Sequence, residues 1–277
     1  ADLTTRRPVP STTLDTLNPF LFLNHHGPQT YRPHNHGLPF GPHPHRGFET
    51  VTFILEGSLA HADTGGHESV IEAGGVQWMT AGSGLIHTEV APQAFKDAGG
   101  KLEILQLWVN LPASLKMTPP RYTGLQRDEI PLYPAADGMA SIQLISGALA
   151  GKVGPIESLT GLFMSVVRAK ESAKVSFANL EGRVVFLYVV RGAVAVNGTT
   201  IPEFNLARLN DDGDAVSFEA LTDSIVLFGH GDPIHEPMAA RGPFVMNTDA
   251  EIVQAIADFR AGKMGVSAGG GPLAPLR

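Results

Sequence analysis

Short runs of apolar and β-branched residues, separated by glycine-rich turns, dominate the chain from residue 47 to residue 110. The runs that we expect to be strands are 48–55, 58–62, 68–71, 76–80, 86–90 and 102–109. Strands that recur every 8–12 residues, with turn signals between them, are typical of a β-sandwich or β-barrel. The first half of the chain is therefore predicted to be all-β.

The same pattern returns in the second half, after a connector at 112–135 that contains five prolines. Expected strands there are 141–145, 161–169, 183–190, 193–196, 204–209, 215–218 and 224–228. Placing Gly57 against Gly192 aligns the apolar run 51–56 with the run 186–191. Such an internal repeat predicts two barrels of the same kind.

A single helix is expected near the end of the chain. Thr248 and Glu251 have the spacing of a capping box, in which each side chain accepts a hydrogen bond from the other residue's backbone. Ile252, Ile256 and Phe259 then recur on one face, and Gly262 ends the segment. We therefore expect one barrel over residues 1–130 and a second barrel over residues 131–247. Residues 248–277 would form a C-terminal helix and tail.

Composition narrows the possible functions. The formal net charge is −7 and there is no basic run, which argues against a nucleic-acid surface. Because the chain has no cysteine, it has no disulfide and no thiolate ligand, so a bound metal must be held by nitrogen and oxygen. No signal peptide and no apolar run of about 18 residues is visible, so we expect a cytoplasmic protein that does not enter the membrane.

Two pairs of metal-capable side chains stand out. His43 and His45 are two residues apart, as are His87 and Glu89, and residues i and i+2 of a strand point to the same face. If the two strands face each other, the four side chains converge, which predicts a metal site with three histidines and one carboxylate. Glu49 shares its parity with His43 and His45, and therefore remains an alternative to Glu89 as the fourth ligand.

The second half of the chain lacks these polar groups. In the alignment of the two repeats, the four positions are occupied by Ala178, Leu180, Val216 and Phe218, all of them apolar. A purely structural role for the four polar residues does not predict so selective a replacement. The first barrel, residues 1–130, is therefore predicted to be an N-terminal metal-binding barrel, and the second, residues 131–247, a degenerate barrel without metal.

The remaining histidines are expected to have other roles. We expect solvated loop positions for His25, His26, His34 and His36. His61 and His67 flank a turn and are expected at the surface. His230 and His235 lack the strand spacing of a second metal site.

The motifs resemble those of a known family. The spacing from Gly37 through 43–49 to Gly57 resembles the first cupin motif, and 84–87 resembles the core of the second. More narrowly, the segments 43–51, 77–82, 86–89 and 242–248 are similar to those of pirins, and the resemblance extends from about residue 18 to about residue 265. It implies a bicupin with two facing barrels and a metal in the N-terminal barrel alone. The ligands it implies are His43, His45, His87 and Glu89.

The resemblance also implies a choice between two functions. One is a quercetin 2,3-dioxygenase, which cleaves a flavonol with dioxygen and in which Glu89 acts as the general base. The other is a non-enzymatic, iron-dependent redox sensor that regulates a protein partner, in the manner of a transcriptional coregulator. Iron as Fe(II) is the metal usually associated with the family, and Mn, Ni, Co, Cu or Zn suit the same ligands. A monomer is expected.

Overall fold

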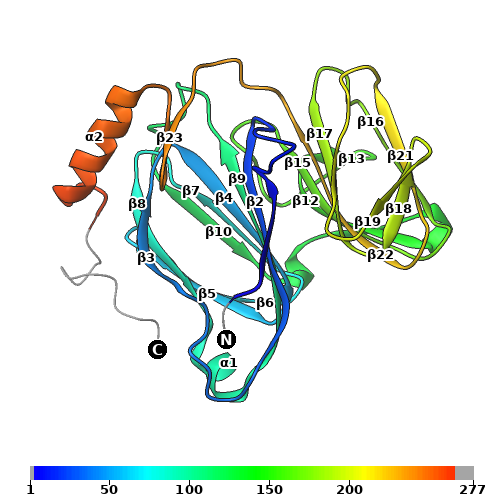
Figure 1. Ribbon diagram of the computed structural model, residues 1–277, viewed down its shortest axis with the longest axis horizontal. Coiled ribbons are helices and arrows are strands. Elements are labelled where there is room, and N and C mark those ends of the chain that lie inside the picture. Colours follow the sequence, from blue (N-terminus) through cyan, green and yellow to red (C-terminus); the bar gives the residue numbers. More distant parts are fainter. Residues whose placement is uncertain (1–2, 266–277) are drawn as a thin grey trace. The chain divides into compact units, whose positions relative to one another are not determined.

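The structure, a computed structural model, describes residues 3–265 of the chain (Figure 1). These residues group into two compact units. Unit 1 contains residues 3–12, 20–127 and 234–265, and unit 2 contains 13–19 and 128–233. The sequence-based domain limits at 130 and 247 stay a prediction, since compactness instead groups the whole segment after residue 233 with unit 1.

Unit 1 is built from two antiparallel sheets. Six strands form the sheet β1-β2-β9-β4-β7-β10, and four form the sheet β3-β8-β5-β6. The strands are β1 (Thr5–Val9), β2 (Phe20–Tyr31), β3 (Phe40–His45), β4 (Phe48–Glu56), β5 (Ser58–Asp63), β6 (Glu68–Glu72), β7 (Val76–Thr80), β8 (Leu85–Val90), β9 (Gly100–Asn110) and β10 (Arg121–Leu125). The expected strands between residues 48 and 109 are thus present, and the short helix α1 (Gln93–Ala98) interrupts the series.

Alternation along each strand decides which side chains lie between the two sheets. Thr52 on β4 lies opposite Gln106 on β9, and both side chains bond to Glu89 on β8 in the other sheet. An apolar cluster that includes the fully buried Leu59 packs in the same interior. Burying one such side chain stabilises the fold by roughly 1.5–3 kcal/mol.

Unit 2 repeats this plan, as the internal repeat predicted. Its sheets are β11-β12-β15-β22-β17-β20 and β16-β21-β18-β19, with a small hairpin β13-β14. The strands are β11 (Leu132–Ala135), β12 (Ala140–Ser146), β13 (Ala148–Leu149), β14 (Lys152–Val153), β15 (Phe163–Ala169), β16 (Lys174–Ala178), β17 (Val184–Arg191), β18 (Ala193–Val196), β19 (Thr199–Pro202), β20 (Leu206–Arg208), β21 (Ala215–Ala220) and β22 (Ser224–Gly231). Two 3-10 turns, η1 (Arg127–Glu129) and η2 (Ala136–Gly138), flank β11.

The strand registers refine the comparison of the two repeats. Val216 on β21 pairs with Phe177 on β16, just as His87 on β8 pairs with His43 on β3. Phe177 is buried and Ala178 is exposed, so the residue in the place of His43 is Phe177 and not Ala178. The alignment of Gly57 with Gly192 is set by glycines that follow β4 and β17. It is one residue out at His43 because the connection to the preceding strand differs in length between the two repeats. The apolar character of the position is unchanged.

The chain ends, within the described residues, in a hairpin and the expected helix. Strands β23 (Ala239–Arg241) and β24 (Phe244–Met246) lead into α2 (Asp249–Arg260), and the capping box of Thr248 and Glu251 is present. Buried Ile252 packs α2 against the hairpin, in a cluster that also contains Ile86 of β8. Phe259, expected on the same apolar face, is 38% exposed and lies outside this cluster. No helix within residues 3–265 is long and apolar enough to span a membrane.

Candidate metal centre

Three histidines from two neighbouring strands converge in unit 1. His43 and His87 are directly paired across β3 and β8, and His45 follows two residues along β3 on the same face. One nitrogen atom from each ring lies within 4.8 Å of the other two. Nε2 of His87 is 3.0 Å from Nε2 of His43. The spacing in the sequence therefore predicted this convergence correctly for all three histidines.

Backbone carbonyls fix two of the three rings. Nδ1 of His43 donates to the carbonyl oxygen of Gly41 at 2.7 Å, and Nδ1 of His45 donates to that of Pro243 at 3.2 Å. A carbonyl oxygen can only accept, so the proton of each neutral ring is on Nδ1 and the lone pair is on Nε2. Both rings therefore present a basic nitrogen to the centre, as metal-bound histidines do.

Burial keeps the rings of His45 and His87 neutral. It lowers the pKa of His45 to about 3, with the neighbouring His43 adding to the effect. It also holds the pKa of His87 well below its usual value, helped by His45 and His43. Neutral imidazole is the form that binds a metal ion. His45 and His87 are therefore poised as ligands at ordinary pH.

The donor set fits a divalent metal ion. With the neutral tautomer of His43 that the Gly41 carbonyl selects, Nε2 directs its lone pair at the imidazole nitrogen of His87, 3.0 Å away in a partly buried site. Imidazole nitrogens are ligands that suit divalent transition-metal ions. In addition, Nδ1 of His87 is buried without a hydrogen-bond partner. Within residues 3–265 no other cluster of at least three metal-capable side chains is present.

Glu89 lies beside the histidines with both oxygens engaged. Oε1 accepts a hydrogen bond from the Thr52 hydroxyl at 2.8 Å, and Oε2 accepts one from the Gln106 amide at 2.6 Å. Oε2 is also 4.0 Å from Nε2 of His87, and the residue is only 3% exposed. Glu89 is not part of the three-histidine cluster, so its role as fourth ligand and general base stays a prediction.

Glu49 is placed differently. It is three residues from Thr52 in a regular stretch of β4, so the two side chains point to opposite faces of the sheet. Its Oε1 accepts a hydrogen bond from the Thr80 hydroxyl at 2.7 Å, and burial raises the pKa of its carboxyl group. The geometry thus favours Glu89 over Glu49.

Aromatic rings form one wall beside the centre. The Trp108 ring lies 5.3 Å from the ring of His45 and 4.5 Å from that of Phe48, measured between centroids. Phe22 stacks on Trp108 at 4.7 Å, and the guanidinium of Arg7 lies 4.7 Å from the Phe22 centroid. A flat aromatic ligand would find complementary surfaces along this wall.

His61 forms part of another wall, contrary to the prediction of a surface position. Its side chain is 1% exposed, and its ring centroid lies 5.5 Å from that of His87. Nε2 donates to Asp63 at 3.0 Å, and the ring stacks on Tyr122 at 3.9 Å. The sequence does contain one indication of this burial, because His61 lies within the mainly apolar expected strand 58–62. His67, by contrast, is exposed as expected.

Two other histidines, His25 and His26, are also buried where the sequence pattern predicts a solvated loop. His25 and His26 lie on β2 and are buried, whereas His34 and His36 are exposed as expected. Nε2 of His25 lies 3.0 Å from Oε1 of Glu103. Because the segment 25–45 is rich in proline and glycine, the sequence did not predict that β2 continues as a twelve-residue strand to Tyr31.

His230 in unit 2 is not a ligand position. Its Nδ1 accepts a hydrogen bond from Nε of Arg183 at 2.6 Å, and its ring stacks on Phe163. Burial, followed by the charge of Arg183, lowers its pKa to about 3. His230 therefore packs as a neutral ring and accepts from arginine.

Known proteins share both the sequence and the fold. The family model "Pirin" matches residues 2–109, and the model "Pirin C-terminal cupin domain" matches residues 164–265. The chain is 38% identical to human "Pirin", over 94% of this chain and 87% of that protein. It is also 38% identical to "Putative quercetin 2,3-dioxygenase PA2418" of Pseudomonas aeruginosa, over 89% of this chain and 86% of that protein.

Solved structures agree with these matches. A quercetin 2,3-dioxygenase from Acinetobacter baumannii superposes with a TM-score of 0.88 at 36% identity, covering 95% of this chain and 91% of that one. The bacterial pirin YhhW from Escherichia coli, in complex with nickel(II), gives a TM-score of 0.64 at 23% identity, over 84% and 93% of the two chains. The second likeness shows the fold alone. With its all-β bicupin fold, its short C-terminal helix and these relatives, the chain belongs to the pirin family.

Proposed function

We propose that the protein is a metal-dependent dioxygenase that cleaves flavonols such as quercetin, with Fe(II) held by His43, His45, His87 and Glu89. The observation that carries the proposal is the convergence of three imidazole rings beside a buried carboxylate and an aromatic wall. The A. baumannii structure, described as a quercetin 2,3-dioxygenase and 36% identical to this chain, supports the same reaction.

When bound, the metal ion would supply Lewis acidity, which lowers the pKa of a flavonol hydroxyl group. The residues of this chain would do the rest. Glu89 would take the hydroxyl proton, a role supported by the 4.0 Å distance between its Oε2 and Nε2 of His87. The hydrogen bonds from Thr52 and Gln106 hold the carboxylate in one orientation, so that little reorganisation is needed during transfer.

Phe22 and Trp108, which are partly exposed and stack on each other, would hold the flat rings of the flavonol and exclude water from the reacting carbons, with the buried Phe48 packed against Trp108. Quercetin and dioxygen would then give a depside and carbon monoxide. The two oxygen atoms of dioxygen enter the depside, and carbon monoxide leaves with the carbon that bore the hydroxyl group. Atoms balance without any further oxidant or reductant.

Oxygen uptake by iron-loaded protein with quercetin tests this proposal. We expect uptake that depends on quercetin and falls at least 100-fold in His87→Ala. The matched control is His34→Ala, which removes an exposed histidine away from the centre and leaves the rate unchanged. Absence of uptake in fully metallated wild-type protein, with several flavonols, would contradict the dioxygenase and favour a metal-dependent binding protein.

The remaining expectations belong to the same proposal. Fe(II) is the metal we expect to find in protein isolated from its own host, although nickel accompanies the YhhW relative. Flavonol and dioxygen are the expected small-molecule partners. A cytoplasmic location, a monomeric state and the absence of nucleic-acid binding stay predictions.

A further inference from the structure

One carbonyl group far along the chain contacts the metal centre directly. The oxygen of Pro243, between β23 and β24, accepts the Nδ1 proton of His45 at 3.2 Å and the backbone N–H of Arg46 at 3.4 Å. The backbone N–H of Val245 in turn donates to the carbonyl of Arg46 at 3.0 Å. The C-terminal hairpin is therefore bonded to the residue that follows the ligand and to the ligand ring itself.

A buried lysine fastens this hairpin to the barrel. Lys116 is 1% exposed, and its ammonium group donates to three oxygens: the carbonyl of Gly47 at 2.9 Å, the carbonyl of Val245 at 3.0 Å, and Oδ1 of Asn110 at 2.7 Å. All three of its protons are used. Lys116 thus ties the turn after β3 to the strand that follows Pro243.

An ion pair fastens helix α2 to the same turn. Nη1 of Arg46 donates to Oδ2 of Asp258 at 2.8 Å, and both side chains are almost fully buried. Nε of Arg46 also donates to the carbonyl of Ser83, just before β8. On the other side, Oδ1 of Asp258 accepts hydrogen bonds from Gln254 and Lys263. Arg46 therefore links both ligand-bearing strands to α2.

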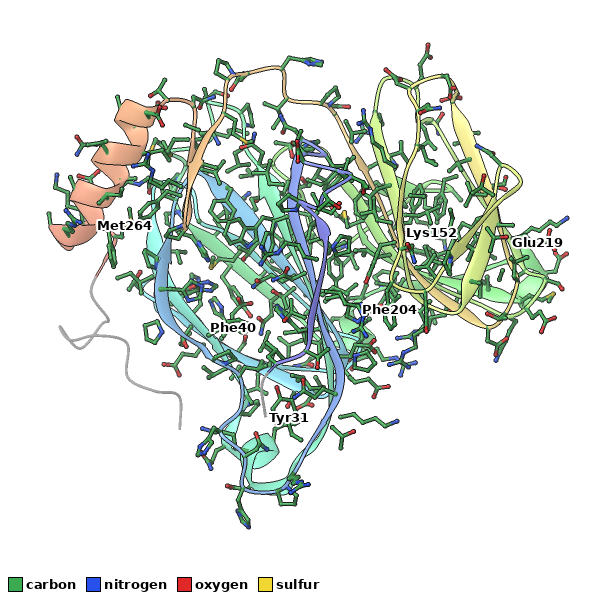
Figure 2. The ribbon with its side chains drawn as sticks, viewed as in Figure 1. Tyr31, Phe40, Lys152, Phe204, Glu219 and Met264 are labelled. Atoms are coloured by element: carbon green, nitrogen blue, oxygen red, sulfur yellow. The ribbon has the colours of Figure 1, made fainter. Side chains whose placement is uncertain are left out.

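The contacts continue to the end of the described chain. The hydroxyl of Thr64 donates to the carbonyl of Met264 at 2.9 Å and accepts from the backbone N–H of Ile86, which lies next to His87. Figure 2 shows Met264 where the chain leaves α2, and Figure 1 shows α2 and β23 beside β3 and β8. Residues 239–264, named here the C-terminal latch, thus contact both ligand-bearing strands.

We infer that the C-terminal latch is a positioning element of the metal centre, with Lys116 and Asp258 as positioning residues that hold the Pro243 carbonyl against His45. The inference rests on the metal site proposed above but not on the dioxygenase activity. The Pro243 carbonyl keeps the proton of His45 on Nδ1 and the ring in one orientation. Outer hydrogen-bond partners of metal-bound histidines typically change affinity 10- to 100-fold when lost.

The test uses Co(II), whose visible absorption reports its ligands, with titrations against a competing chelator. We expect Asp258→Ala and Lys116→Met to weaken Co(II) binding about 10-fold or more. Asp97→Ala is the matched control, because Gln93 and Asp97 on α1 form the same Gln–Asp pair, four residues apart, as Gln254 and Asp258. The control should bind Co(II) like the wild type.

A second readout follows the ring itself. In metal-free wild-type protein, nitrogen NMR of labelled histidine should show a single His45 tautomer with its proton on Nδ1. In Asp258→Ala the signal should shift toward a mixture of tautomers, which general loss of stability would not produce in protein that remains folded. Unchanged Co(II) affinity and an unchanged tautomer in folded Asp258→Ala would overturn the inference. Failure of wild-type protein to bind Co(II) would instead overturn the metal site.

Discussion

Nε2 of His87 lies 3.0 Å from Nε2 of His43, across a pair of neighbouring strands. Because the Gly41 carbonyl holds the proton of His43 on Nδ1, the two nitrogens share at most one proton between them. We therefore predict that the double variant His43→Ala, His87→Ala loses metal binding, with an affinity at least 1,000-fold below that of the wild type. Metal content after dialysis and direct titration measure this loss. Full metal occupancy in the double variant would place the site elsewhere.

Comparison of Glu89→Gln with Glu49→Gln tests which of the two carboxylates is the fourth metal ligand. Glu89→Gln keeps the size of the side chain but removes the charge and the basic oxygen, so metal affinity should fall about 10-fold and turnover of quercetin at least 100-fold. Glu49→Gln should leave both almost unchanged, since Glu49 lies on the other face of β4 and bonds to Thr80. Chelator competition and oxygen uptake give the two numbers. A larger effect from Glu49→Gln would reverse the assignment.

The convergence of the three histidines could be predicted from the sequence because it depends largely on local spacing. Alternation along a strand is a two-residue rule, and it brought His43 and His45 to one face without knowledge of the fold. The place of His61 depends on the pairing of β5 with β8, which sets it opposite Glu89. Pairing between strands is set by tertiary packing, and a turn signal nearby favoured the surface instead.

The contact between His45 and Pro243 could not be predicted from the sequence at all. The two residues are separated by 198 positions, and the acceptor is a backbone carbonyl that any residue possesses. No side-chain pattern records such a partner. The assignment of Ala178 instead of Phe177 to the position of His43 has a similar cause. The length of a connection between strands differs between the two repeats, and the sequence pattern does not show this difference.

Gly47 should tolerate no side chain. Its φ is +87°, and a Cβ atom there would lie 2.0 Å from the carbonyl oxygen of Val245. Gly47→Ala should therefore destabilise the protein by more than about 2 kcal/mol, through backbone strain and displacement of the C-terminal latch. Gly66→Ala is the control, since Gly66 has almost the same φ of +88° but open space around it. Urea unfolding should show a cost of about 1 kcal/mol there, and equal costs at both positions would contradict the packing argument.

His26 should contribute to acid sensitivity. Burial, with the neighbouring charges of His25 and Arg7, lowers its pKa from 6.5 to about 4. As the pH falls from 6.5 towards 4, the unfolded chain gains a proton that the folded protein does not bind, so stability decreases. The slope is at most about 1.4 kcal/mol per pH unit for one group. His26→Gln should flatten the decrease in unfolding free energy between pH 7 and 4.5, whereas His34→Gln, at an exposed position, should not. An unaltered pH profile in His26→Gln would refute the assignment.

The most direct test of the proposed chemistry is the fate of isotopically labelled dioxygen. Iron-loaded protein is given quercetin under 18O2, and the products are analysed by mass spectrometry. The proposal predicts a depside that contains both labelled oxygen atoms, together with unlabelled carbon monoxide, and predicts neither product from the His43→Ala, His87→Ala variant. An unlabelled product, or equal product from the variant, would contradict catalysis at the three-histidine centre.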